Sequence, residues 1–402
     1  MSEPATRAPE PRSETLRLAT LNVWALPFGI ARHVPERMEA TGRRVAELEL
    51  DLVAYQEVWT EPARAALLVA GRRAGLVHAW HRRRNPRSGS GLLVLSRRPF
   101  LGRPSFARFA LRGLPQRIHH GDYWGGKGFV LARVATTAGP LTVLNTHLQA
   151  QYTPDPIDEY RGIRTGQIAE LAYDLRAVGD PVVALGDFNV REGNPDHGVL
   201  MGLTRFADVA LALGRPQDTV TRPHPYRGAG HGGAGKTSGE RIDYVFTRTG
   251  RRADALPVSI ERDFDARFRV GGEDATCSDH AGLWAEVEIA PVPPRPLPAA
   301  LPVALARARS LFAQGRGEAL RRQGVVRSLA LGGAALAVAA LPGAAQIRAS
   351  RRHFLAGVVA GVGVAALPGA AAAAWLSEVG VPRELDTYDY LETLLSTFVP
   401  AA

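Results

Sequence analysis

Polar side chains suited to phosphate and metal chemistry recur where apolar stretches of this chain end. They are Asn22 in LNVW, Glu57 in QEVW, His147 in NTHL, Asp187 and Asn189 in GDFN, Asp243 in RIDYV, and Asp279 with His280 in SDH. Singly, each has an ordinary structural explanation, such as a turn asparagine or a hydrogen-bonded histidine. Together they bring carboxylate, carboxamide and imidazole groups from six strand ends, a set that is costly to bury without a cation.

The donor chemistry of this set favours Mg²⁺, with Mn²⁺ as the alternative. Most of the donors are hard oxygen atoms, which both ions prefer, and a structural zinc would call for softer ligands. Cys277 is the single cysteine of the chain, so an internal disulfide framework and a thiolate metal cluster are both excluded.

Alternating strand-like and helical stretches must position these groups. We expect strands at residues 16–24, 51–59, 89–100, 127–136, 141–148, 181–190, 241–248 and 280–289, and helices at 35–50, 62–74 and 158–178. A loop rich in Gly, Pro and His follows at 222–240. Hairpins mixed with crossovers predict an α/β fold in which two sheets pack face to face with helices outside.

The composition divides the chain into six segments. We expect a disordered N-terminus at 1–14, a catalytic domain at 15–290, a Pro-rich linker at 291–302, a basic juxtamembrane segment at 303–327, two hydrophobic membrane segments at 328–377 and a C-terminal tail at 378–402. The runs Ser328–Ile347 and His353–Ser377 lack Asp, Glu, Lys and Arg, and each could cross a hydrocarbon core of roughly 30 Å as one arm of a helical hairpin. A buried hairpin is the alternative.

The order of the motifs resembles the endonuclease/exonuclease/phosphatase superfamily, and within it the neutral sphingomyelinases. The segments that carry the resemblance are LNVWALPFG (21–29), RHVPERM (32–38), IHHGDYWGGKG (118–128), THLQAQY (146–152) and ERIDYVF (240–246). The resemblance covers about 275 residues of the chain. It implies a four-layer α/β sandwich of the metal-dependent phosphodiesterase type.

The resemblance also implies roles for the residues named above. Glu57 would be the principal Mg²⁺ ligand with Asn22 beside it, and Asp279 would complete the metal site.

In the same comparison, His280 would be the general base that takes a proton from water, and Asp243 would hold its imidazole. Asp187 would orient the attacking water, while Asn189 and His147 would contact the non-bridging phosphate oxygens. Phosphodiester hydrolysis needs such a base together with a cation that neutralises developing charge.

The glycine-rich segment 121–127 matches the opening of a nucleotide-binding P-loop, G-x-x-x-x-G-K. Gly128 stands where a Ser or Thr should follow, and a strand rather than a helix comes next, so we reject that function. The segment instead resembles the lysine-bearing loop of neutral sphingomyelinases. Its candidate substrate residues are Lys127, Asp122, Tyr123 and Trp124, the aromatic pair lining a choline-sized pocket or serving a structural role.

These observations predict a membrane-associated, phospholipase C-type enzyme that hydrolyses sphingomyelin or a related phospholipid to a phospho-headgroup and a neutral lipid. The net charge of +10 also permits nucleic acid as a partner, so a nuclease on the same scaffold is the alternative, and a binding module with a decayed site is a third. No protein partner is predicted. Residues 1–14 lack the apolar core of a signal peptide, which predicts a cytoplasmic-facing catalytic domain. Residues 350–355 resemble a twin-arginine export signal or form a loop between the apolar runs.

Overall fold

The computed structural model describes residues 11–82, 91–111, 113–114, 117, 120, 122–153, 157–221, 239–349 and 353–398. The expected disorder of the first residues falls largely outside these ranges. So do most of the loop at 222–240 and the arginines of the twin-arginine-like segment.

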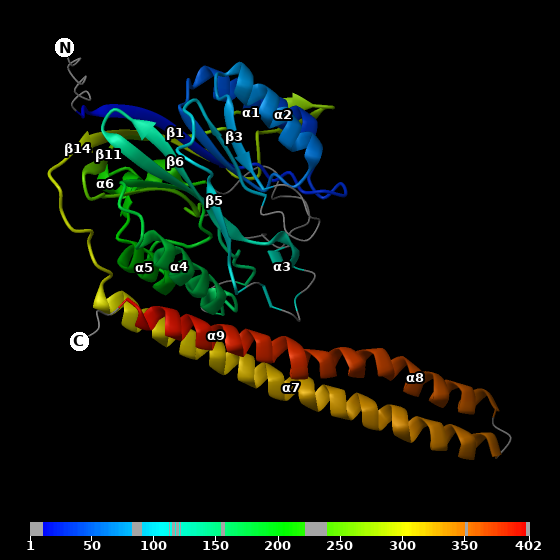
Figure 1. Cartoon of the computed structure of the whole chain (residues 1–402). Helices are drawn as coiled ribbons and strands as arrows, with labels where there is room; N and C mark the ends of the chain where they lie inside the picture. The colour runs from blue at the N-terminus through cyan, green and yellow to red at the C-terminus, as the bar shows by residue number, and fades with distance from the viewer. Residues whose placement is uncertain are drawn as a thin grey trace, which may run out of the picture.

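Two six-stranded sheets form the body of the domain (Figure 1). The first has the order β11 (Ala253–Asp263), β14 (Gly282–Pro291), β1 (Glu14–Asn22), β2 (Leu52–Gln56), β4 (Leu93–Ser96) and β3 (His78–His81). The second has the order β5 (Ser105–Arg108), β6 (Gly128–Thr136), β7 (Gly139–His147), β8 (Val182–Asp187), β10 (Asp243–Arg248) and β9 (Ala207–Asp208). A separate hairpin joins β12 (Phe268–Val270) to β13 (Glu273–Ala275).

The two sheets pack face to face because both faces of their central strands are apolar. In β1, Leu16 and Leu18 point to the core between the sheets, whereas Ala19 and Leu21 pack under the helices on the outer face. This alternation follows from the two-residue period of a strand. Strands buried on both sides are expected in an α/β sandwich with covering helices. The predicted fold class is confirmed.

Helices cover both outer faces. The larger ones are α1 (Val34–Glu47) and α2 (Glu61–Arg73) over the first sheet, and α4 (Arg161–Leu175) and α5 (Pro195–Thr204) over the second (Figure 1). Shorter helices are α3 (Asp122–Gly125), α6 (Val209–Ala212) and the 3₁₀ turn η2 (Pro216–Thr219).

A small polar network interrupts the apolar layer between the sheets. The Nε2 of Gln56 donates hydrogen bonds to Asn145 Oδ1 at 2.8 Å and to Thr20 Oγ1 at 3.0 Å, and Asn145 Nδ2 donates to the Tyr55 carbonyl at 3.0 Å. All of these side chains are buried. Buried polar groups that are hydrogen-bonded in this way favour one relative placement of the sheets. The network lies beside the strand ends at which Glu57 and His147 stand.

Two features of the fold were not expected from the sequence. The edge strand β11 contains Pro257 and several charged residues, which obscure a strand pattern but are tolerated at a sheet edge. The segment at 158–178 forms a shorter helix, α4, that is buried on most sides rather than amphipathic, because the C-terminal helices cover the face that solvent would otherwise contact.

The C-terminal helices begin and end on the two-sheet domain. Helix α7 (Pro302–Ala349) turns back through α8 (His353–Trp375) and the π-helical segment η4 (Leu376–Gly380) into α9 (Val381–Ser396). Ala308 and Phe312 of α7 and Tyr388 and Leu391 of α9 belong to the same buried cluster as α4. The basic segment at 303–327 and the tail at 378–402 thus both contribute to the core of the domain.

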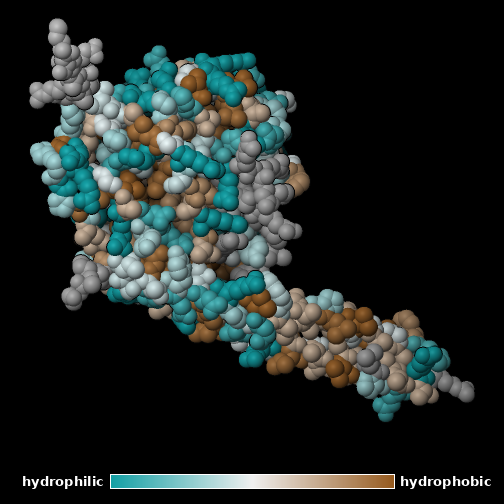
Figure 2. Space-filling view, viewed as in Figure 1, coloured by the Kyte–Doolittle hydropathy of each residue, from teal (hydrophilic) through white to brown (hydrophobic). Residues whose placement is uncertain are grey.

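The middle of this helical hairpin projects away from the domain (Figure 1). Both of its arms are long and apolar enough to cross a membrane, and only 12% and 11% of their most apolar 18-residue windows is buried. Figure 2 shows hydrophobic residues around the projecting part and hydrophilic ones at its tip. Pro342 and Pro368 lie inside the helices, which continue through them. The two arms are therefore candidate membrane anchors.

We predict that Leu391→Ala lowers the free energy of unfolding of the full chain by about 2–5 kcal/mol, because it leaves a cavity between α9 and α4. Thermal unfolding in detergent micelles measures the change. The exposed Thr393 of the same helix is the matched control, and Thr393→Ala should change the stability by less than about 0.5 kcal/mol. Equal effects of the two substitutions would show that α9 does not contribute to the domain core.

Candidate active site

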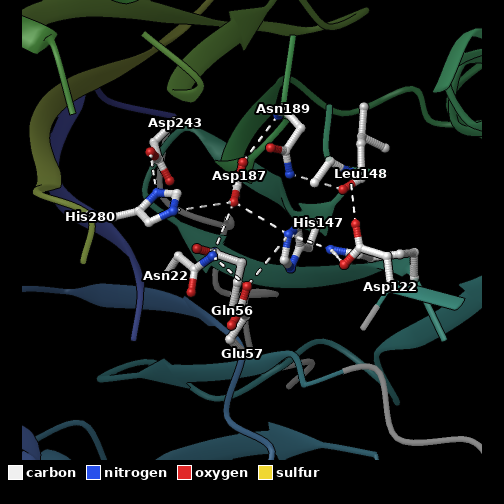
Figure 3. A network of polar contacts seen from close by, with 12 residues as sticks. Asn22, Gln56, Glu57, Asp122, His147, Leu148, Asp187, Asn189, Asp243 and His280 are labelled. Atoms are coloured by element: carbon white, nitrogen blue, oxygen red, sulfur yellow. Dashed lines mark hydrogen bonds and ion pairs between the residues drawn. The ribbon is translucent and has the colours of Figure 1, made fainter. Parts of the chain in front are cut away.

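Most of the predicted site residues meet where central strands of the two sheets end (Figure 3). His147 and Asp187 are the last residues of the parallel neighbours β7 and β8 and pair with each other. Asp243 opens the antiparallel strand β10 and pairs with Asp187 from the other side. In the first sheet, Asn22 ends β1 opposite Gln56, the residue before Glu57. Strand register alone thus places these groups at neighbouring positions, at the strand ends where α/β folds bind ligands.

The Asn22 amide links carboxylates from both sheets. Its Nδ2 donates to Glu57 Oε1 at 3.1 Å and to Asp187 Oδ2 at 3.0 Å. Its Oδ1 accepts a hydrogen bond from the Trp24 amide at 3.0 Å, which sets the orientation of the carboxamide. Asn22 therefore joins the two sheets at the site, as the Gln56–Asn145 hydrogen bond does beside it.

Glu57 stands where the chain leaves β2 in a left-handed conformation, with φ at 58°. Such a conformation costs free energy for a residue other than glycine and is often found at functional sites. Its Oε2 is buried and has no hydrogen-bond partner among the described residues. Burial raises the pKa of Glu57 to about 7; the charge of Lys127 opposes this shift and that of Asp279 adds to it.

His280 and Asp243 form a hydrogen-bonded pair beside Asp187. His280 Nδ1 lies 2.8 Å from Asp243 Oδ2, and its Nε2 lies 4.0 Å from both Asp187 Oδ2 and Asp279 Oδ1. Burial, together with the charge of Asp243, raises the pKa of Asp187 to about 6, against the opposing effect of His280. A carboxylate on Nδ1 holds the imidazole so that Nε2 faces the site, which is the arrangement that a histidine general base requires.

His147, Lys127 and Asp122 form the opposite wall. His147 Nε2 lies 3.3 Å from Asp187 Oδ2 and 2.5 Å from Lys127 Nζ, which in turn lies 2.9 Å from Asp122 Oδ1. Burial and the positive charge of Lys127 hold the pKa of His147 well below its usual value, so this imidazole is neutral near pH 7. Asp122 Oδ2 accepts hydrogen bonds from Gln149 Nε2 and the Ala150 amide. The glycine-rich loop is thus attached to the end of β7.

Asn189 lies just beyond strand β8, so strand alternation does not set its direction. Strand β8 ends at Asp187, and Asn189 adopts a left-handed conformation with φ at 50°. Its backbone amide donates to Asp187 Oδ1 at 3.1 Å, and its Nδ2 donates to the Leu148 carbonyl at 3.1 Å. The side chain still reaches the site, but through a turn that positions Asp187.

The two aromatic candidates are less closely tied to the site. Tyr123 lies half-buried in the short helix α3, with its backbone next to Gly113. The side chain of Trp124 lies outside the part of the chain that the structure describes. Gln149, within the THLQAQY segment, and the Gln56–Asn145 pair had not been singled out from the sequence, although they hold the loop and the sheet ends in place.

The donor set suits a metal ion on two grounds. The buried, unpaired Oε2 of Glu57 next to the Asn22 amide is costly without a cation. In addition, ligand atoms of Asp187, Asp243 and His280 lie within 4.8 Å of one another, so this group could hold a metal ion. A metal ion held by that group would compete with the Nδ1 contact between His280 and Asp243.

Comparison with known proteins places this geometry in a family. The profile of the Endonuclease/Exonuclease/phosphatase family matches residues 19–280. A putative neutral sphingomyelinase of Drosophila melanogaster is 30% identical over 284 residues, which are 70% of this chain and 62% of that protein. An inositol phosphosphingolipids phospholipase C of Schizosaccharomyces pombe is 31% identical over 215 residues, 52% of this chain and 47% of that protein. The matches thus span about half to two thirds of these relatives.

The fold agrees with a solved structure. Sphingomyelinase C from Streptomyces griseocarneus superposes with a TM-score of 0.51 at 20% identity, over 68% of this chain and 99% of that one. At this identity the likeness concerns the fold alone.

We predict that Glu57→Gln stabilises the metal-free protein at high pH. The pKa of Glu57 in the folded chain, about 7, exceeds its ordinary value of 4.5, so its burial destabilises the fold increasingly as pH rises from 4.5 through 7. The gain in unfolding free energy on substitution should be about 3 kcal/mol at pH 8 and below about 1 kcal/mol at pH 5. Thermal unfolding in chelator at the two pH values measures it.

Divalent cation should offset most of this difference. Saturating Mg²⁺ or Mn²⁺ should raise the Tm of the wild-type chain and leave the Tm of Glu57→Gln unchanged. At a hundredfold excess of cation over Kd, the free energy of unfolding of the wild-type chain should rise by about 2.7 kcal/mol. Glu170→Gln is the matched control, since burial also raises the pKa of Glu170 to about 7 on helix α4, away from the site. A cation-induced shift that survives in Glu57→Gln would contradict the assignment of this ligand.

Proposed function

The chain belongs to the endonuclease/exonuclease/phosphatase family, and we propose that it is a membrane-associated, Mg²⁺-dependent phospholipase C-type enzyme acting on sphingomyelin or a related phospholipid. The observation that carries the proposal is the position of the Glu57 carboxylate next to the hydrogen-bonded His280–Asp243 pair, with Asp187 between them. The buried Oε2 of Glu57 has no hydrogen-bond partner among the described residues. That pairing offers a cation site and a proton acceptor side by side, which are the two requirements of phosphodiester hydrolysis. The names of the Drosophila and Schizosaccharomyces relatives support a sphingolipid as substrate.

Three side chains would hold the ion. Glu57 would be the principal ligand, with Asn22 beside it and Asp279 completing the site. When bound, Mg²⁺ neutralises negative charge that develops on the phosphate. The raised pKa of Glu57 accords with this role, because a carboxylate that is costly to ionise alone has most to gain from a cation.

His280 moves the proton. Its Nε2 accepts a proton from water while the water oxygen bonds to phosphorus, and Asp243 at Nδ1 stabilises the imidazolium that forms. Asp187, facing Nε2 at 4.0 Å, orients the attacking water. The bond from phosphorus to the lipid oxygen breaks, and that oxygen takes up a proton to give a neutral lipid and a phospho-headgroup.

The opposite wall would bind the phosphate. His147 and Asn189 would contact the non-bridging oxygens, and the Lys127 ammonium, held next to His147 by Asp122, would add positive charge there. We also propose that Tyr123 lines the headgroup pocket through a cation–π contact. Because His147 is neutral, Lys127 supplies the positive charge on this wall.

The hairpin favours lipid over nucleic acid as the substrate. An active domain attached to two apolar arms would be held at the surface where phospholipids are found, whereas a nuclease has no need of such an anchor. We further propose that the domain faces the cytoplasm. The chain has six arginines in 303–327, next to the domain, and three in 348–352, between the two apolar arms. The larger number next to the domain accords with the excess of basic residues on the cytoplasmic side of membranes.

We predict that the full chain with Mg²⁺ releases phosphorylated headgroup from sphingomyelin in mixed micelles, and that chelator abolishes the release. His280→Ala should lower kcat/KM by about 10²- to 10⁴-fold, because proton transfer from water is lost. His78→Ala on β3, outside the site, is the matched control. A screen across phospholipid headgroups identifies the substrate. Efficient nicking of plasmid DNA without lipid turnover would favour the nuclease instead.

For the membrane anchor, we predict that deleting 328–375 moves the protein from the membrane fraction to the soluble fraction of expressing cells. This deletion keeps the root of α7 and helix α9, whose side chains complete the core over α4. A truncation after residue 300 is unsuitable, since it would uncover that core. Sedimentation followed by immunoblotting measures the distribution, and an unchanged distribution would argue against the anchor.

A further inference from the structure

We infer that the loop 23–33, between β1 and α1, inserts Phe28 and Ile30 into the lipid surface next to the active site. The inference rests on the proposed function, because it assumes that the substrate lies in a membrane. It adds a second lipid contact to the candidate hairpin anchor and assigns this contact to the catalytic domain itself.

The tip of the loop presents large apolar side chains to solvent. Phe28 is 96% exposed and Ile30 is 50% exposed. Phe28 has φ at 62° and Gly29 has φ at 73°, so a bulky residue occupies a left-handed conformation that favours glycine or asparagine. A side chain added at Gly29 would meet no atom within 4 Å. The fold thus holds an aromatic ring in water in a strained backbone conformation, which no contact within the described chain explains.

The base of the loop, in contrast, is held firmly. The buried Arg37 donates hydrogen bonds to the carbonyls of Val23 at 2.9 Å and Trp24 at 2.8 Å, and its guanidinium lies over the Trp24 ring. The Ala25 amide donates to the Glu57 carbonyl at 3.1 Å. A rigid base with an apolar tip is suited to insertion, because little conformational entropy remains to be lost on binding.

The direction of the loop identifies lipid as its partner. It continues from the end of β1 at which Asn22 joins the active site, and in Figure 1 it leaves the domain on the side toward which the hairpin projects. With the hairpin arms in a bilayer, the tip would face the same surface. The tip is also six residues from Asn22, so its insertion would bring the strand ends of the site to the level of the headgroups.

The variant Phe28→Asn tests the inference on the full chain. Asparagine tolerates the left-handed conformation better than phenylalanine, so the Tm should be unchanged or higher. Turnover of sphingomyelin in vesicles should fall by about 10- to 100-fold through the lost burial of one aromatic ring, whereas turnover of a monomeric short-chain substrate should not change. Equal losses on both substrates, or no loss on vesicles, would overturn the inference.

Leu256→Asn is the matched control. Leu256 is 42% exposed on β11 and is level with Thr15 across β14, at the opposite end of β1 from Asn22. Its substitution should leave turnover on vesicles unchanged.

A second measurement does not depend on catalysis. An environment-sensitive fluorophore is attached to Phe28→Cys in the full chain, and in a second sample to Leu256→Cys. In reconstituted vesicles, brominated phosphatidylcholine should quench the fluorescence of the label at position 28 and not that of the label at position 256. Cys277 should not react, because it is 5% exposed and burial raises the pKa of its thiol to about 11. Absence of quenching at position 28 would refute insertion. Quenching by an enzyme that hydrolyses no lipid would instead refute the proposed function and leave the loop contact standing.

Discussion

The electrostatic cost of gathering buried carboxylates is the constraint on which the site depends. Glu57, Asp187 and Asp243 converge from both sheets, and burial raises the pKa of the first two. The chain offsets part of this cost with the Asn22 amide and with His280 on Asp243. One oxygen of Glu57 nevertheless has no partner among the described residues. Concentrating negative charge in this way lowers the stability of the fold, and the same group of side chains could hold a metal ion.

The fold that gathers these carboxylates is a two-sheet sandwich whose strands pair in a well-defined register. One-residue slippage of β8 against β7 would turn Asp187 away from His147, because successive side chains of a strand point to opposite faces. The apolar layer between the sheets is not directional, so it cannot alone set their relative position. The hydrogen bonds of Gln56 with Asn145 and Thr20 supply that direction close to the site. Structural and functional polar groups are therefore neighbours here.

The C-terminal helices combine two physical roles. Where α7 and α9 lie on α4, their apolar side chains complete the core of the two-sheet domain. Where α7 and α8 project beyond it, the apolar side chains are exposed and suit hydrocarbon. Because the same helices continue from one environment to the other, the domain is attached to the candidate anchor by a rigid junction and not by a flexible linker. Such a junction fixes which side of the domain, and hence which loops, would face a membrane.

By itself, the sequence determined the α/β class, the two apolar arms and the identity of the polar groups, because strand period, apolar run length and motif order are local properties. It did not reveal that Asn189 adopts a left-handed conformation just beyond β8, or that β11 forms an edge strand. It also left 378–402 without a role, although Tyr388 and Leu391 are core residues. Only the tertiary structure decided these points. Left-handed turns, edge pairing and helix docking depend on partners that lie far away in the chain, so no local pattern encodes them.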